Sequence, residues 1–232
     1  MDTAAAKKIL IICYSLSGQT SNLLARLANG LESAGVAVTI ERLRPVKPLR
    51  FPFGSIRATV VMMLLTFFRK RIPIAPLSDK CKGRYDLMIL AGPTWSYHPS
   101  GPILALFDRD GSTLFANQAV IPLISCRGYW RMHWFGLRAL LNKNGASVAN
   151  RIVFTHPSKE PWRTLGVFLK LAGRSPERSQ FIGRYYPRYG HAKKQLEEAC
   201  RFGAMLGQAL SEGKDLSSLD FQTPLAIIRG GF

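Results

Sequence analysis

The sequence predicts an α/β fold built on a doubly wound parallel sheet of five strands, and three observations support this class. Short apolar runs typical of buried strands alternate with segments of helical periodicity. A turn rich in serine, glycine and threonine directly follows the first run. Loops with aromatic residues follow the third and fourth runs. Alternating strands and helices form a parallel sheet, and a ligand turn after the first strand favours the strand order 2-1-3-4-5.

The elements follow from hydrophobic periodicity. Residues 9–13 are a short apolar run, and residues 20–32 place four leucines on one helical face. Pro122 lacks the N–H that a strand interior needs, so it suggests a bend or a strand end. The remaining strands are expected at 36–43, 85–91, 119–125 and 151–155, and the remaining helices at 102–107, 134–144 and 190–210.

Length and composition indicate one elaborated domain. Residues 1–212 are expected to form it, with a first insertion at about 44–84, a second insertion at about 156–190, and a C-terminal tail at 213–232. The four cysteines form no CxxC pair, so neither a metal site nor a disulfide framework is indicated. Reduced cysteines and a first apolar run too short for a signal peptide favour the cytoplasm.

The chain is strongly basic, with 32 Lys and Arg against 14 Asp and Glu. This balance favours an anionic partner such as a phosphorylated ligand or a membrane surface. The apolar run at 58–68 has basic flanks and is too short to span a bilayer. Because it has no polar face, we favour a buried helix over a helix lying in the membrane interface.

The second insertion contains another basic and apolar helical segment, at 161–172. The two insertions could fold together over the sheet edge, as a lid above a ligand or as a membrane-facing patch. Extra core and a homo-oligomer interface are the alternatives.

The turn at 14–20 combines a strand end with a helix N-terminus. Backbone N–H groups, the helix dipole and the hydroxyls of Ser15, Ser17 and Thr20 would favour an anion. The alternative is an ordinary helix cap. The loops at 92–99 and 126–131 offer aromatic rings that could stack on a flat ligand, and their positions after the third and fourth strands strengthen the case for a phosphate site over a cap.

The motif Tyr-Ser-x-Ser-Gly-Gln-Thr resembles the FMN-phosphate loop of the flavodoxin-like family, and Gly-Pro-Thr-Trp-Ser-Tyr resembles its ring-binding loop. The sequence has Ser17 and Gln19 where that family usually has Thr and Asn. Segments 50–53 and 125–130, together with the long segment before the last helix, further resemble the branch labelled dialkylresorcinol-condensing enzymes. Membership of that branch would keep loss of flavin binding open as an alternative. The resemblance implies phosphate contacts at Ser15, Ser17, Gly18, Gln19 and Thr20, and ring contacts at Pro93, Thr94, Trp95, Ser96, Tyr97, Arg127, Gly128 and Tyr129.

The resemblance also implies an FMN-dependent oxidoreductase, with NAD(P)H binding only transiently because no GxGxxG motif follows a strand. Arg127 or Arg131 near the ring would stabilise a negatively charged reduced flavin and favour two-electron chemistry. His98 is the candidate proton donor. The expected substrate is lipophilic, such as a quinone or a phenolic compound, and the expected location is cytoplasmic, peripheral to the inner face of the membrane.

Two other function classes are weighed. One is a membrane- or partner-binding protein that keeps the fold without redox activity. The other is nucleic-acid binding, which is disfavoured because no recognised binding motif accompanies the charge.

Overall fold

The computed structural model describes residues 6–228, whose strands form one seven-stranded sheet. β2, β1, β3 and β5 are neighbours in that order, and all their pairings are parallel. Both β6 and β7 pair with the outer side of β5, so together they occupy the place of a fifth strand and the expected order is confirmed. The strands are β1 (Lys8–Cys13), β2 (Ala37–Arg42), β3 (Leu87–Trp95), β4 (His98–Pro99), β5 (Ala119–Cys126), β6 (Ser147–Val148) and β7 (Ile152–Thr155).

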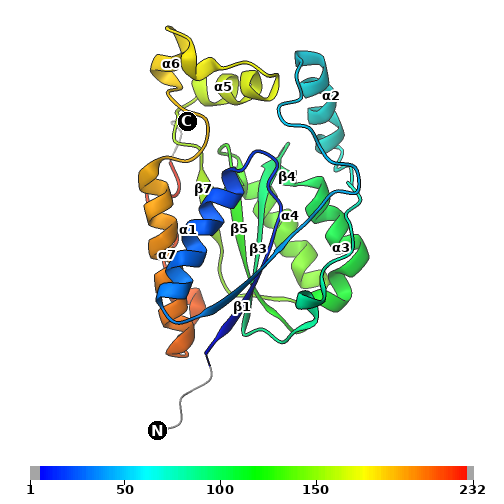
Figure 1. Ribbon diagram of the computed structural model, residues 1–232, viewed down its shortest axis with the longest axis vertical. Helices are drawn as coiled ribbons and strands as arrows, with labels where there is room; N and C mark the ends of the chain where they lie inside the picture. The colour runs from blue at the N-terminus through cyan, green and yellow to red at the C-terminus, as the bar shows by residue number, and fades with distance from the viewer. Residues whose placement is uncertain (1–5, 229–232) are drawn as a thin grey trace.

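Helices cover both faces of the sheet (Figure 1). Ile9 and Ile11 pack with α1 and α7, whereas Leu10 and Ile12 belong to the cluster that includes α3 and α4. This alternation follows from the two-residue period of a strand. The helices are α1 (Gln19–Ser33), α2 (Ile56–Phe67), α3 (Gly101–Leu114), α4 (Trp130–Lys143), α5 (Trp162–Leu171), α6 (Ile182–Tyr185) and α7 (Lys193–Ser211), with 3₁₀ turns at Asp79–Lys82, Pro176–Arg178 and Leu216–Ser218.

Pro122 neither ends nor divides its strand, contrary to the expectation of a strand end. It lies inside β5 opposite Leu90 of β3. On the other side of β5, pairing with β6 stops at Val120 and pairing with β7 begins at Leu123. The sheet therefore accommodates the missing N–H of proline at the gap between two short edge strands.

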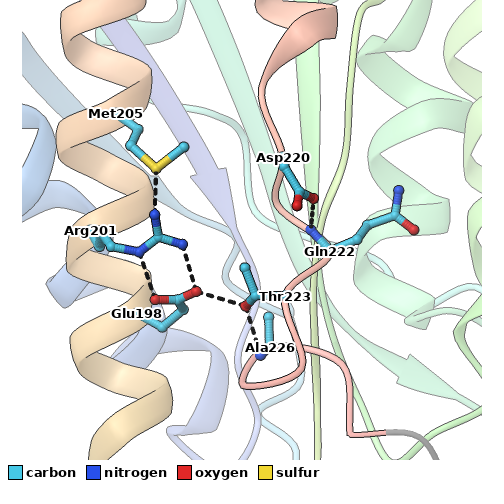
Figure 2. Close-up of polar contacts among 7 residues, drawn as sticks. All are labelled: Glu198, Arg201, Met205, Asp220, Gln222, Thr223 and Ala226. Carbon is cyan, nitrogen blue, oxygen red and sulfur yellow. Dashed lines mark hydrogen bonds and ion pairs between the residues drawn. The ribbon is translucent and has the colours of Figure 1, made fainter.

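The C-terminal tail packs on its own domain. Glu198 of α7 accepts hydrogen bonds from Arg201 at 2.8 and 2.7 Å and from the Thr223 hydroxyl at 2.7 Å, as Figure 2 shows. Further along the tail, the carbonyl of Ala226 accepts from the N–H of Thr155 in β7 at 2.9 Å. The tail thus closes the edge of the sheet beside α7.

The two insertions lie together beyond the carboxyl edge of the sheet, where α2, α5 and α6 stand above the strand ends (Figure 1). The N–H of Phe53 donates to the carbonyl of Leu171 at 2.8 Å and ties the first insertion to the second. The expectation that 58–68 forms a buried helix is wrong, because only Thr59 and Thr66 of α2 are buried. Val61, Leu65 and Phe68 on its outer side are exposed among residues 6–228. Within residues 6–228, none of the helices combines the length and the apolar character needed to cross a membrane.

Candidate functional site

The turn between β1 and α1 presents free backbone donors. The N–H of Tyr14 donates to the carbonyl of Ala91 at 3.0 Å, which aligns the turn with β3. Gly18 has a φ of +82°, and α1 begins at the next residue. The N–H groups of residues 15–20 donate to no group in the described part of the chain. Unpaired donors at the positive end of a helix dipole are the features of an anion-binding turn, and we call residues 15–20 the anion cradle.

The loop after β3 is a tight hairpin in which Trp95 pairs with His98 of β4. The two turn residues, Ser96 and Tyr97, have φ values of +43° and +72°, which non-glycine residues adopt only at some energetic cost. The first insertion holds this strained turn in place. The Ser96 hydroxyl donates to the Met63 carbonyl at 2.9 Å and lies 2.7 Å from the Thr66 hydroxyl.

The loop between β5 and α4 supplies the other side of the site. The Arg127 guanidinium lies 5.7 Å from the centre of the Tyr129 ring, and that ring contacts Tyr97 of the hairpin edge-on at 5.5 Å. Gly128 lies directly against Arg163 of α5, since a Cβ built on it would be 2.6 Å from that guanidinium. The second insertion is therefore docked on this loop.

These loops enclose two adjoining cavities at the carboxyl edge of the sheet. The small cavity, of about 120 Å³, lies beside the anion cradle. The large cavity, of about 400 Å³, lies under the insertions and has mainly apolar walls from α2 and α5. Both are lined by Leu16, Thr94, Trp95, Arg127, Val167 and Leu171. One cleft thus runs from a polar end to an apolar end.

The structure brings most of the expected site residues together. Ser15, Ser17, Gln19, Thr20 and Pro93 line the small cavity, whereas Ser96, Tyr97 and Tyr129 line the large one. Thr94, Trp95 and Arg127 line both.

Some expected residues lie outside the cleft. Gly18, Gly128 and His98 line neither cavity, and His98 sits behind the hairpin near Phe67. Arg131 is also displaced from the expected position near the ring site, since its guanidinium stacks on Trp130 at 5.2 Å and lines neither cavity.

His156 is a lining residue that sequence reasoning did not assign to the site. Its Nδ1 accepts the Ser158 N–H at 3.2 Å, so the proton lies on Nε2, which is buried without a partner in the described residues. Burial, followed by the charges of His191 and Arg163, lowers the pKa of His156 to about 3, and the ring stays neutral. Its position just after the fifth predicted strand was the available signal.

Two further residues, His133 and Tyr189, contribute to the cleft. The Thr94 hydroxyl lies 2.7 Å from Nδ1 of the buried His133, whose pKa is lowered to about 3 mainly by burial. From the second insertion, Tyr189 lines the small cavity, and its pKa is raised by burial while nearby Ser17 and Gln19 side chains counteract the rise. The sequence marked neither residue.

The strand order, the two helical layers and the ligand-type turn after β1 define a flavodoxin-like α/β fold. Neither a protein-family model nor a curated protein matches the sequence.

Solved structures with a similar arrangement of elements include three flavoproteins, all with low sequence identity. One is a flavodoxin from the domain Archaea, with 13% identity, a TM-score of 0.48 and coverage of 88% of this chain and 99% of that one. A flavoprotein from Lactobacillus acidophilus in complex with FMN has 20% identity, a TM-score of 0.46 and coverage of 63% and 92%. A WrbA-like flavodoxin from Agrobacterium tumefaciens has 14% identity, a TM-score of 0.48 and coverage of 90% and 100%.

The residues of the cleft fit an FMN molecule. The cradle's free N–H groups, the hydroxyls of Ser15, Ser17 and Thr20, and the unpartnered Nε2–H of His156 are donors that suit a phosphate. The rings of Trp95, Tyr97 and Tyr129 are suited to a flat heterocycle. The polar donors lie at one end of the cleft and the aromatic rings at the other, as the phosphate and the ring lie at opposite ends of FMN.

Proposed function

We propose that this protein is an FMN-dependent oxidoreductase that reduces a lipophilic, quinone- or phenolic-like substrate by two electrons near the inner face of a membrane. The observation that carries the proposal is the single cleft that joins an anion cradle to an aromatic, apolar cavity. A phosphate in the small cavity would anchor the cofactor, and its ring would face the large cavity. When bound, FMN would supply hydride-type chemistry.

Charge at the cleft supports two-electron reduction over single-electron transfer. Arg127 lines both cavities, and no salt bridge of Arg127 occurs among the described residues. A guanidinium beside the ring favours the negatively charged reduced cofactor. NAD(P)H would then bind transiently over the ring, with its phosphates near the basic insertions.

The walls of the large cavity support the lipophilic substrate. Met63, Leu64 and Phe67 of α2 face Val167 and Phe168 of α5 across it. A cavity of about 400 Å³ falls within the usual range of small-molecule sites, roughly 300–1,000 Å³. Burying an apolar ring there would be favourable by about 25 cal/mol for each Å² removed from water.

Spectroscopy and reconstitution test the cofactor. Purified protein should show a flavin spectrum and release FMN on denaturation, and stripped protein should regain FMN. Riboflavin, which lacks the phosphate, should bind at least about tenfold more weakly if the cradle supplies one charge-assisted contact, roughly 1.4 kcal/mol. Ser17→Ala should narrow this difference between FMN and riboflavin. A colourless protein that takes up neither compound would overturn the proposal.

The alternative is a membrane- or partner-binding protein without redox activity. The exposed apolar face of α2 favours it. This alternative predicts that the purified protein is colourless and takes up no FMN, and that it still binds a membrane or a protein partner.

A further inference from the structure

The outer face of α2 is apolar and uncovered. Thr59 and Thr66 are the buried residues of α2, and helical spacing places Val61, Leu65 and Phe68 on the side of the helix away from them. None of these three lines a cavity, and the exposed fraction of Phe68 is 76%. Phe181, just before α6 of the second insertion, is a further exposed apolar side chain, with an exposed fraction of 67%, and α6 stands beyond the same edge of the sheet as α2 (Figure 1). We call the side chains of Val61, Leu65, Phe68 and Phe181 the apolar tip.

The two insertions that carry the tip also carry most of the positive charge of the chain. Residues 44–84 and 156–190 contain 17 Lys and Arg but three acids, which gives these segments +14 of the net +18. Each of those acids is already paired with a cation: Asp79 with Lys82, Glu160 with Arg163, and Glu177 with Lys170. The insertions therefore have no acidic group left to balance their excess charge.

We propose that the apolar tip and its basic surroundings dock on an anionic phospholipid bilayer. A helix with apolar residues in the acyl boundary and Lys or Arg at head-group level is the arrangement that binds such a surface. Arg57 lies one turn before Val61 and Lys70 follows the end of α2, and both are exposed, so each end of the helix has a cation that can reach head groups. A second copy is a poor occupant, because it would bring a second pair of strongly basic insertions against the first.

Docking with the apolar tip toward the bilayer also suggests how substrate reaches the cavity, and this step rests on the proposed function. The large cavity is lined by residues of α2 and α5, and α2 with its C-terminal cap also carries Val61, Leu65 and Phe68 of the tip. A lipophilic substrate could therefore pass from the bilayer into the cavity without crossing water.

Co-sedimentation with vesicles tests the docking. The full chain should bind vesicles of phosphatidylcholine containing phosphatidylglycerol, and should bind phosphatidylcholine alone at least about tenfold more weakly. Raising the salt concentration should reduce binding, since roughly 1 M salt screens charges beyond about 3 Å. Binding is read from the protein in the pellet, so it needs no flavin.

Matched variants distinguish a loss of binding caused by changing the apolar tip from one caused by added negative charge anywhere on the protein. Leu65→Glu combined with Phe68→Glu should lower vesicle affinity at least about tenfold, because it places charge where apolar contact is needed. Ser33→Glu combined with Ile40→Glu makes the same charge change on α1 and β2 and should leave affinity within about twofold, since each charge acts only within a Debye length. Wild-type protein that ignores anionic vesicles at low salt would overturn the docking, as would a dimer in solution that dissociates in the tip variant. Flavin content measured on the same samples reports the proposed function separately.

Discussion

Gly18 is the residue on which the shape of the anion cradle depends. Its φ of +82° lies in the left-handed region, which glycine adopts without the strain that other residues incur. A Cβ at this position would have no neighbouring atom within 4 Å. Gly18→Ala should therefore cost only backbone strain, about 1 kcal/mol of stability. If the strain is relieved by a change of φ, the N–H groups lose their convergence. We expect FMN affinity to fall about tenfold, a change worth roughly 1.4 kcal/mol, measured by fluorescence titration of stripped protein.

Gly213 offers the matched control for this change. It has a φ of +66° and equally open surroundings, and it follows α7 far from the cleft. Gly213→Ala should lose a similar amount of stability and keep its FMN affinity. Equal affinity losses in both variants would contradict the role given to Gly18.

For single residues, the sequence predicts those features of the site that depend on neighbours in the chain. The turn at 14–20 could be identified because a strand end, small residues and a helix start are consecutive. For His156 the only local signal was its position just after a predicted strand. The burial and the partners that bring His156 and Tyr189 into the site come from segments distant in the chain. Arg163 illustrates the limit: helical periodicity places it apart from the apolar face, yet it is buried against Gly128 of another loop.

At the scale of elements, helices α1 and α7 pack closely because glycines stand at their contact. A Cβ on Gly203 would lie 2.1 Å from the carbonyl oxygen of Leu27, a backbone atom that cannot yield without moving the helix. Gly203→Ala should therefore push the helices apart and reduce the free energy of unfolding by about 3 kcal/mol, a typical cost of overpacking. Urea denaturation measures the change.

The comparison is Gly136 of α4, where an added Cβ meets nothing within 4 Å. Gly136→Ala should raise the free energy of unfolding by roughly 0.5–1 kcal/mol through helix propensity. If Gly203→Ala were equally stabilising, the close approach of α1 and α7 would be wrong.

Helix α2 shows why an element's place is harder to predict than its type. Its apolar run correctly indicated a helix, but an all-round apolar helix is compatible with burial and with an uncovered surface position. The position of α2 is set by tertiary structure: both insertions stand beyond the carboxyl edge of the sheet, and within residues 6–228 no further helix or strand lies over them (Figure 1). The hairpin at 95–98 escaped prediction for a related reason, since Ser96 and Tyr97 have no intrinsic preference for positive φ.

For the whole molecule, three buried neutral histidines make stability depend on pH. The pKa values of His133 and His156 are lowered to about 3 and that of His191 to about 4, in each case chiefly by burial. In the unfolded chain each would titrate near its ordinary value of about 6.5. Below that pH the unfolded state binds more protons, so stability is lost as pH falls from about 6.5 toward 4.

Between pH 6 and pH 5 each of these histidines should cost about 1 kcal/mol, because the unfolded chain takes up nearly one proton per histidine that the folded chain refuses. Urea denaturation at the two pH values should show a loss of roughly 3 kcal/mol in the free energy of unfolding. His133→Asn removes one titrating group while an amide can still reach Thr94, which His133 contacts at 2.7 Å. In that variant the difference between pH 6 and pH 5 should shrink by about a third. A pH-independent wild type would mean that these rings protonate within the fold, and the packing around them would then have to be looser than the structure has it.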